Sequence, residues 1–193
     1  MTADAPDLEL LERTRAGDPA AFEAILGRYW GPVARYATAL LIDGDEAEDA
    51  AQECFIRLWE RRESWVSEGS LRGLLFQIVR NLAFDARRQD RARARAALAA
   101  RETPPPHTPE QHTESGELRT LIETAIRALP ERRREVFVLV RCDGLPHREV
   151  ARLLGISPQT VANHLSLALS DLRDALASAR DIPPIGRTSS SRA

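Results

Sequence analysis

The chain has 193 residues, of which 43% are hydrophobic and 29% are charged, and its formal net charge is −2 at pH 7. This composition excludes a fully disordered protein and predicts a soluble globular chain with one core or two small ones. No apolar run approaches the roughly 20 residues of a membrane span, and the amino terminus lacks the pattern of a secretory signal. We therefore expect a cytoplasmic protein that does not insert into membranes.

The sequence predicts an all-α fold, because strand signals are nearly absent and helix starts are frequent. Asp18-Pro19 and Ser157-Pro158 each place a side-chain acceptor at an N-cap. Each pair also places a proline at the first helical position, where its missing N–H is tolerated. Both pairs therefore mark the beginning of a helix.

An acidic helix is predicted within "DGDEAEDAAQECFIRLWERR", residues 43–62. Ala47, Ala51 and Cys54 face one way at helical spacing. The polar residues on adjacent turns of the other face are Asp45, Glu48, Asp49, Gln52 and Glu53. Helix capping explains acids in the first turn but not those that follow. A surface that repels DNA, in a chain with features of a DNA-binding protein, favours docking on a basic protein partner.

A long helix with an arginine-rich edge is predicted from Ser70 onward. Its buried stripe consists of Leu71, Leu75, Ile78, Leu82 and Ala86. A second face carries Arg80, Phe84, Arg87, Arg91 and Arg95. Arginines at this spacing can track a phosphate backbone, and the amides of Gln77 and Asn81 can hydrogen-bond the edges of unpaired bases. The alternative is a solvated charged face, although the excess of one sign favours a polyanionic partner.

Two segments lack apolar periodicity. The run "ETPPPHTPEQHTESG" at residues 102–116 contains four prolines and small polar residues, which predicts a flexible linker between two helical domains. The run "DIPPIGRTSSSRA" at residues 181–193 predicts an irregular, frayed tail.

The stretch "DGLPHREVARLLGISPQTVANHLSLAL", residues 143–169, predicts a helix-turn-helix. Ala151 is small where two helices would cross, Gly155 can end the first helix in a left-handed conformation, and Val161 fills the core. The outward stripe of the second helix then consists of Gln159, Asn163 and Ser166. This stripe would face a groove of DNA. The alternative is an amphipathic hairpin that packs on protein.

These features, in this order, resemble the extracytoplasmic-function (ECF) subgroup of bacterial RNA polymerase sigma factors over nearly the whole chain. "DEAEDAAQECFIRLW" is similar to the family's polymerase-docking segment, and "SLRGLLFQIVRNLAFDARR" is similar to its minus-ten segment. "ALPERRREVFVL" and "GLPHREVARLLGISPQTVANHL" resemble its minus-thirty-five domain. The resemblance implies a transcription initiation factor that binds core RNA polymerase, directs it to specific promoters and helps to melt the minus-ten element. It also implies an anti-sigma factor as a partner.

Three sets of site residues follow from the helical faces and this resemblance. The expected polymerase-binding residues are Asp45, Glu48, Asp49, Gln52, Glu53, Leu58 and Trp59. The expected contacts to single-stranded minus-ten DNA are Phe76, Gln77, Arg80, Asn81, Phe84, Arg87, Arg88 and Arg91. The expected contacts to the minus-thirty-five duplex are Arg148, Ser157, Gln159, Thr160, Asn163, His164 and Ser166. The loop at residues 64–70 is the expected pocket for a flipped base.

The chain departs from the family pattern at two places. Leu74 and Phe76 stand where the family often has an aromatic pair, so a stacking role passes to Phe76. Ala162 and His164 stand where it often has a lysine and an arginine. The resemblance implies that the polymerase supplies most of the electrostatic grip on DNA. The arginines left to hold flanking phosphates are Arg132, Arg133, Arg134 and Arg148.

We therefore expect two domains and no catalytic activity. The expected units are a region 2-like domain at 7–95, a linker at 96–116, a region 4-like helix-turn-helix domain at 117–177 and a tail at 178–193. The sequence contains no metal-ligand spacing, glycine-rich phosphate loop or nucleophile constellation, so no metal or cofactor is expected. Cys54 and Cys142 are expected to be buried, inert thiols.

Two other classes of protein remain as alternatives. A stand-alone helix-turn-helix regulator with an amino-terminal sensing domain would not need the acidic face or the arginine edge, and it would usually dimerise. A helical adaptor for other proteins explains the acidic helix, but it does not explain the helix-turn-helix spacing. Whether the purified chain lets core RNA polymerase start at a specific promoter separates the three.

Overall fold

The computed structural model describes residues 5–41, 43–64, 70–100 and 114–180. Within these ranges the chain is helical and contains no strand, so the predicted all-α fold class is confirmed. The helices are α1 (Ala5–Arg15), α2 (Pro19–Leu40), α3 (Gly44–Glu60), α4 (Leu71–Ala100), α5 (Glu114–Ala128), α6 (Glu131–Phe137), the π-helix η1 (Val138–Cys142), α7 (His147–Leu154) and α8 (Pro158–Arg180).

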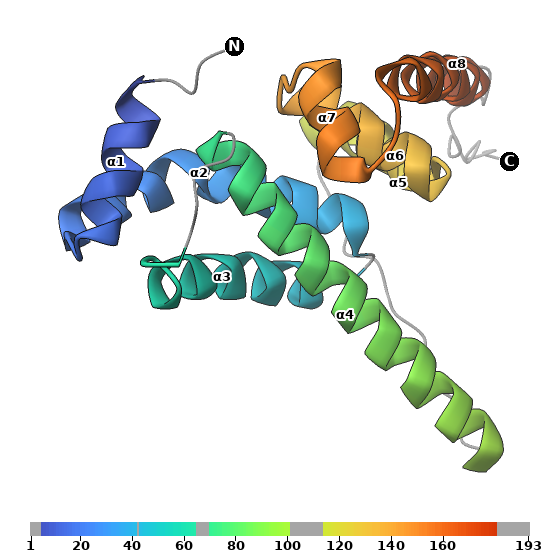
Figure 1. The fold of residues 1–193 in the computed structure, drawn as a ribbon. Helices are drawn as coiled ribbons and strands as arrows, with labels where there is room; N and C mark the ends of the chain where they lie inside the picture. The colour runs from blue at the N-terminus through green and yellow to red at the C-terminus, as the bar shows by residue number, and fades with distance from the viewer. Residues whose placement is uncertain (1–4, 42, 65–69, 101–113, 181–193) are drawn as a thin grey trace, which may run out of the picture.

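Helices α1 to α4 form the amino-terminal half of the molecule (Figure 1). Helix α2 packs against α3 and α4, and its Ile25, Val33 and Tyr36 are fully buried. Phe76 of α4 is also fully buried and packs on Tyr36 with ring centroids 5.0 Å apart. Only the first half of α4 belongs to this core, and its second half projects away from the other helices (Figure 1).

Aspartate caps fix the beginning of two of these helices. Asp18 accepts a hydrogen bond from the backbone N–H of Ala20 at 3.0 Å, and Pro19 occupies the first helical position as predicted. Asp43 accepts from the backbone N–H of Asp45 at 2.9 Å at the start of α3. Each carboxylate satisfies a backbone donor that the helix leaves unpaired, and each complements the helix dipole.

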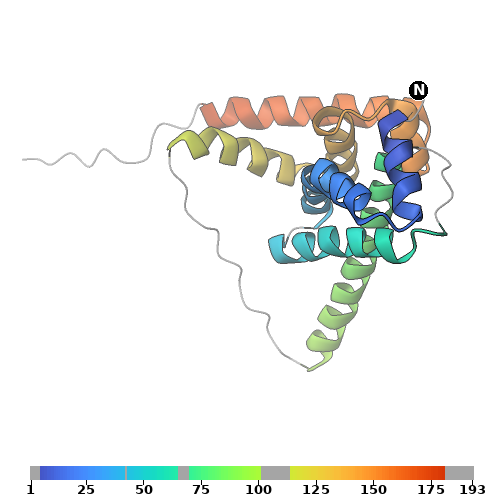
Figure 2. The ribbon, with the colours of Figure 1, turned by 90° about the vertical axis from the view of Figure 1, so that its left-hand side faces the viewer.

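Helices α5 to α8 form the carboxy-terminal half. Helices α5 and α8 lie side by side (Figure 2) and bury Ala125, Leu129, Ala168 and Leu172 between them. The buried apolar side chains of α6 and η1, such as Val136 and Leu139, belong to the core that these helices share with α2 of the amino-terminal half.

The predicted helix-turn-helix consists of α7 and α8. Gly155 has φ +67° and ends α7, Ala151 is 5% exposed where the helices meet, and Val161 is fully buried. The hydroxyl of Ser157 accepts from the backbone N–H of Thr160 at 3.0 Å, which caps α8. The predicted helix-turn-helix is therefore confirmed at Ala151, Gly155 and Val161.

The two halves share one hydrophobic core. Helix α6 and η1 pack against α2, and α7 packs against the beginning of α4. Buried residues from both halves, such as Tyr36, Phe76, Val136, Leu139 and Val150, belong to one continuous cluster. The sequence predicts two domains, but it does not predict that they are packed together.

Helical residues extend into both ends of the segment that the sequence predicts as the linker. Helix α4 continues to Ala100, and α5 begins at Glu114. Residues 101–113 lie outside the described residues, as do most of the predicted flipped-base loop (65–69) and the tail from residue 181. The boundaries of the domains stay predictions.

Candidate protein and nucleic-acid interfaces

Helix α3 presents its acidic face to solvent. The exposed residues of this face are Asp45, Glu48, Asp49 and Gln52. Glu53 is half-buried and accepts from Arg57 Nε at 2.8 Å, four residues further along the helix. Ala47, Ala51 and Cys54 face the core, because three- and four-residue spacing separates the two sides of the helix.

Two residues of the expected polymerase-binding set lie behind this face. Leu58 is fully buried, so in this arrangement it holds α3 on the core and is out of reach of a partner. Trp59 is half-buried against Phe22, with ring centroids 5.1 Å apart, and the guanidinium of Arg62 lies 4.8 Å from its ring.

One exposed residue beside the acidic face is not among the residues predicted from the sequence. Ile56 follows Gln52 by one turn and is 49% exposed, which is the largest exposure among the big apolar side chains of the described residues. An exposed isoleucine beside carboxylates is typical of a protein interface with an apolar centre and a polar rim. Its signal in the sequence is an apolar residue at the spacing of the polar stripe.

The arginine edge of α4 lies against the carboxy-terminal half. Arg80 Nε donates to Glu135 of α6 at 2.9 Å, and the Arg80 guanidinium lies 4.6 Å from the Phe84 ring. Arg87 makes a bidentate pair with Glu131, and its second hydrogen bond is 2.8 Å long. Hydrogen bonding to Arg87 lowers the pKa of Glu131, and the same pair raises the pKa of Arg87.

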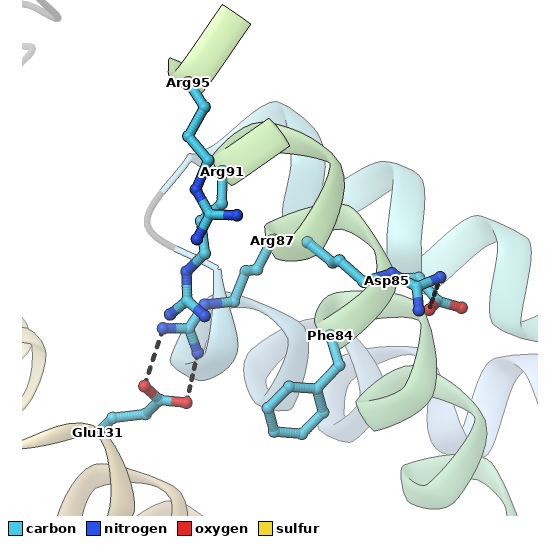
Figure 3. Close-up of a pocket in the computed structure, with 7 residues that line it drawn as sticks. Phe84, Asp85, Arg87, Arg91, Arg95 and Glu131 are labelled. Atoms are coloured by element: carbon cyan, nitrogen blue, oxygen red, sulfur yellow. Dashed lines mark hydrogen bonds and ion pairs between the residues drawn. The ribbon is translucent and has the colours of Figure 1, made fainter. Parts of the chain in front are cut away.

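Beyond this pair, an open basic groove lies between α4 and α6 (Figure 3). The groove has a volume of about 410 Å³ and is lined by Phe84, Asp85, Arg87, Arg88, Arg91, Arg95 and Glu131. Arg91 and Arg95 are exposed, and neither has an ion-pair partner among the described residues. Arg88 lies 3.4 Å from Asp85 but is 83% exposed. These three guanidinium groups are accessible to a polyanion.

The remaining expected minus-ten residues differ in accessibility. Asn81 is exposed, and its side-chain oxygen accepts from Gln77 Nε2 at 3.2 Å. Phe76 has no exposed surface, because its ring packs on Tyr36 inside the core. In this arrangement Phe76 is a core residue and cannot stack on a base. Phe84 is half-exposed and lines the groove, so it is the aromatic ring of α4 that a base can reach.

The beginning of α8 presents a polar surface. The exposed polar residues here are Ser157, directly before the helix, and Gln159, Asn163 and Ser166 on it. The side chain of Gln159 donates to the amide oxygen of Asn163 at 3.1 Å, so these two amides form one unit on the helix surface. Thr160 is half-buried, and Arg148 of α7 is exposed.

His164 and the arginines of α6 are less available than the sequence suggests. The Nδ1 atom of His164 is buried and has no hydrogen-bond partner among the described residues. Arg133 donates to Asp171 of α8 at 2.6 Å, and Arg134 donates to the carbonyl of Ala39 at 2.6 Å. Burial lowers the pKa of Arg134. These two arginines hold helices together, which leaves Arg148 as the better candidate for a phosphate contact.

Within the described residues, no cluster of three or more histidine, cysteine, aspartate or glutamate side chains has the geometry to hold a metal ion. No described helix is both long and apolar enough to span a membrane.

Comparisons with known proteins agree with the two halves of this structure. Residues 25–93 match the family model described as Sigma-70 region 2, and residues 119–172 match the one described as Sigma-70, region 4. The probable RNA polymerase sigma factor RfaY of Xanthomonas campestris pv. campestris is 35% identical over 185 residues, which are 91% of this chain and 46% of the relative. The ECF RNA polymerase sigma factor SigE of Mycolicibacterium smegmatis is 30% identical over 167 residues, which are 83% of this chain and 65% of the relative.

A solved structure shows the same fold. The sigma factor RpoE from Bartonella quintana, crystallised in complex with the anti-sigma factor NepR, matches with a TM-score of 0.63 and 23% identity over 81% of this chain and 96% of that chain. The chain thus spans less than two thirds of the two curated relatives above, but nearly all of this solved one.

The two matched regions follow each other in the order region 2 and then region 4, and each lies in one of the two helical halves described above. The chain belongs to the extracytoplasmic-function group of the sigma-70 family. The alternative of a stand-alone regulator is not favoured, because its amino-terminal half would have no reason to match region 2.

Proposed function

We propose that this chain binds core RNA polymerase in the cytoplasm and directs it to specific promoters. The observation that carries the proposal is the separation of charge on α3 and α4. One half of the molecule presents a carboxylate face that repels DNA and an arginine edge that attracts it, so it can hold a protein and a nucleic acid at once.

The acidic face of α3 is the proposed polymerase-binding surface. Asp45, Glu48, Asp49 and Gln52 supply its exposed polar atoms, and Ile56, one turn beyond Gln52, supplies an apolar contact beside them. Opposite charge on the partner steers its approach, and burial of the isoleucine then adds affinity.

The arginine edge of α4 is the proposed surface for the opened minus-ten strand. Arg88 and Arg91 can neutralise phosphates, Asn81 can hydrogen-bond a base edge, and Phe84 can stack on an unpaired base. The exposed start of α8 is the proposed reader of the minus-thirty-five duplex, since an amide such as that of Asn163 can hydrogen-bond a base pair in the major groove.

An anti-sigma factor is a further proposed partner. The sigma factor from Bartonella quintana has this fold and was solved with one bound. A protein that covers the same surfaces would keep both polymerase and DNA away from this chain.

Charge reversal on α3 tests the proposal. We expect the double variant Asp49→Arg with Glu53→Arg to lose co-purification with core RNA polymerase, because like charges then face each other across the interface. Its helical content should stay unchanged, since Asp49 is exposed and the pair of Glu53 with Arg57 is partly exposed and contributes little stability.

The matched control reverses two exposed acids of the same half. Glu9 and Glu12 lie on α1 and not on α3, and Glu9→Arg with Glu12→Arg makes the same change in net charge. We expect this control to bind polymerase like the unaltered chain. Full binding by the α3 variant, or equal loss in both variants, would contradict the assignment of α3.

A further inference from the structure

Glu135 of α6 joins the two halves of the molecule at a buried point. Its side chain is 1% exposed. One carboxylate oxygen accepts from the Tyr36 hydroxyl and from Arg80 Nε, both at 2.9 Å, and the other accepts from Arg132 at 3.1 Å. Burial and the neighbouring carboxylate raise the pKa of Tyr36 well above its ordinary value, so the hydroxyl keeps its proton and donates.

Glu131 makes a second contact of the same kind, one turn earlier on α6. Its two oxygens accept from the two terminal nitrogens of Arg87, which lies two turns after Arg80 on α4 (Figure 3). Two carboxylates on one face of α6 therefore meet two arginines on one face of α4. The side chains of Arg80 and Arg87 are only 14% and 26% exposed.

A third set of contacts holds the beginning of α4. Asp143 is buried at the end of η1, and its Oδ1 accepts from Arg35 Nη2 at 2.7 Å. Arg72 donates to the backbone carbonyl of Asp143 at 2.7 Å, and the hydroxyl of Ser70 bonds to Glu149 of α7. The contacts between the halves therefore run from the first turn of α4 to its middle.

Carboxylates and phosphates bind a guanidinium through the same donors. An arginine whose N–H groups already point at a glutamate cannot give them to a phosphate oxygen at the same time. At Arg87, whose two terminal nitrogens both donate to Glu131, pairing with α6 and binding of a DNA phosphate through these nitrogens are therefore mutually exclusive. Arg80 gives its Nε to Glu135 and is only 14% exposed, so α6 also limits the access of DNA to this residue.

We infer that the packing of α6 against α4 through Glu131 and Glu135, which we call the closed arrangement, is autoinhibitory. The two glutamates occupy Arg87 and Arg80 in place of DNA phosphates. The carboxy-terminal half must therefore move away before the minus-ten strand can bind. The inference rests on the proposed function, in which α4 binds that strand. Arg88, Arg91 and Arg95 stay accessible in the adjoining groove, so an incoming strand first meets these three and then competes with Glu131 for Arg87.

The test measures how tightly the whole chain, without polymerase, binds a fluorescent single-stranded oligonucleotide of mixed sequence. Glu131→Gln removes the negative charge that pairs with Arg87 across the two halves. Tyr36→Phe removes a buried hydrogen bond to Glu135 without changing any charge or any proposed DNA contact. Apparent affinity scales with the fraction of open molecules, so we expect both variants to bind tighter, Glu131→Gln by about tenfold. Small-angle X-ray scattering should show a larger radius of gyration for both.

Asp171→Asn is the matched control. Asp171 is 34% exposed and pairs with Arg133 inside the carboxy-terminal half, whereas Glu131 is 35% exposed and pairs across the halves. Each change removes one negative charge and frees one arginine. We expect the control to bind the oligonucleotide like the unaltered chain, with an unchanged radius of gyration.

Three results would overturn the inference. The first is an unchanged affinity for the oligonucleotide in both Glu131→Gln and Tyr36→Phe. The second is an equal increase in affinity in the control Asp171→Asn. The third is a larger radius of gyration in Glu131→Gln and Tyr36→Phe without tighter binding of the oligonucleotide. The far-ultraviolet circular dichroism signal of the helices identifies a variant that fails to fold. If Glu131→Gln fails to fold, Tyr36→Phe, which changes no charge, still tests the inference. Failure of the proposed function is separate, because the unaltered chain would then not bind core RNA polymerase at all.

Discussion

At the scale of single residues, Gly155 decides where α7 ends and how α8 departs from it. Its φ of +67° lies in the left-handed region, and a Cβ built on it would meet no atom within 4 Å. A residue with a Cβ at this position would therefore lose stability only through the strained left-handed backbone conformation, and not through a steric clash. We expect Gly155→Ala to lower the free energy of unfolding by about 1–2 kcal/mol, measured by urea unfolding.

Gly27 supplies the control for this prediction. It lies in the middle of α2, is exposed, and has no atom within 4 Å of an added Cβ and no positive φ. The same change to alanine should raise the free energy of unfolding there by about 0.5–1 kcal/mol, because alanine loses less backbone entropy in a helix. Equal effects at both positions would contradict the role given to the left-handed conformation of Gly155.

Periodicity predicts which way a side chain points, but it does not predict what covers it. The stripe that includes Leu71, Leu75 and Ile78 is buried as expected. Family position placed Leu58 and Phe76 in binding sites, although both lie in the core. The prediction that both cysteines are buried is correct for Cys54 and wrong for Cys142, which lies exposed in η1.

At the scale of elements, the Ser157 cap fixes where α8 begins, but the exposed surface at this end of the helix carries no charged side chain. Its exposed start carries serine, glutamine and asparagine, and the nearest candidate for a phosphate contact is Arg148 on α7. Counterion release depends on the number of phosphates neutralised, so this surface should hold duplex DNA weakly by itself.

Adding one arginine to this surface tests that reasoning. We expect Ala162→Arg to strengthen binding of the whole chain to a mixed-sequence duplex and to steepen its dependence on salt by up to about 0.9 in log–log slope. Fluorescence anisotropy at several salt concentrations measures both. Ala175→Arg, at an exposed position further along the same helix, is the control and should change the slope less. Equal slopes in the two variants would contradict the placement of DNA at the start of α8.

The order and type of the helices could be predicted from capping, proline placement and apolar spacing, because these are local signals. The π-helix η1 could not, since its extra residue per turn leaves no mark in a short apolar run such as "VFVLV". This element matters, because Asp143 directly follows it and accepts a hydrogen bond from Arg35.

At the scale of the whole molecule, the closed arrangement explains why the charge pattern alone is ambiguous. An arginine edge predicts a partner rich in anionic oxygen, and both a DNA strand and α6 satisfy that requirement. Which of them is present depends on contacts between residues 44 to 55 positions apart, such as Arg80 with Glu135 and Arg87 with Glu131. No local pattern in one sequence encodes such a pairing.

The shared core predicts that the two halves unfold together. All three tryptophans, Trp30, Trp59 and Trp65, precede α4, so their fluorescence reports on the amino-terminal half, whereas far-ultraviolet circular dichroism reports on helices of both halves. Because one buried cluster runs from α2 through α6 to α7, we expect the two signals to give one coincident urea transition.

Removing the buried carboxylate should separate the two signals. Glu135→Ala leaves the Tyr36 hydroxyl and the Arg80 guanidinium without their shared acceptor, and breaking a buried pair in this way costs about 3–5 kcal/mol. That loss falls on the contact between the halves, so the carboxy-terminal half should unfold at lower urea than the tryptophans report. Coincident transitions in the variant, or separate ones in the unaltered chain, would contradict the coupling of the two halves through Glu135.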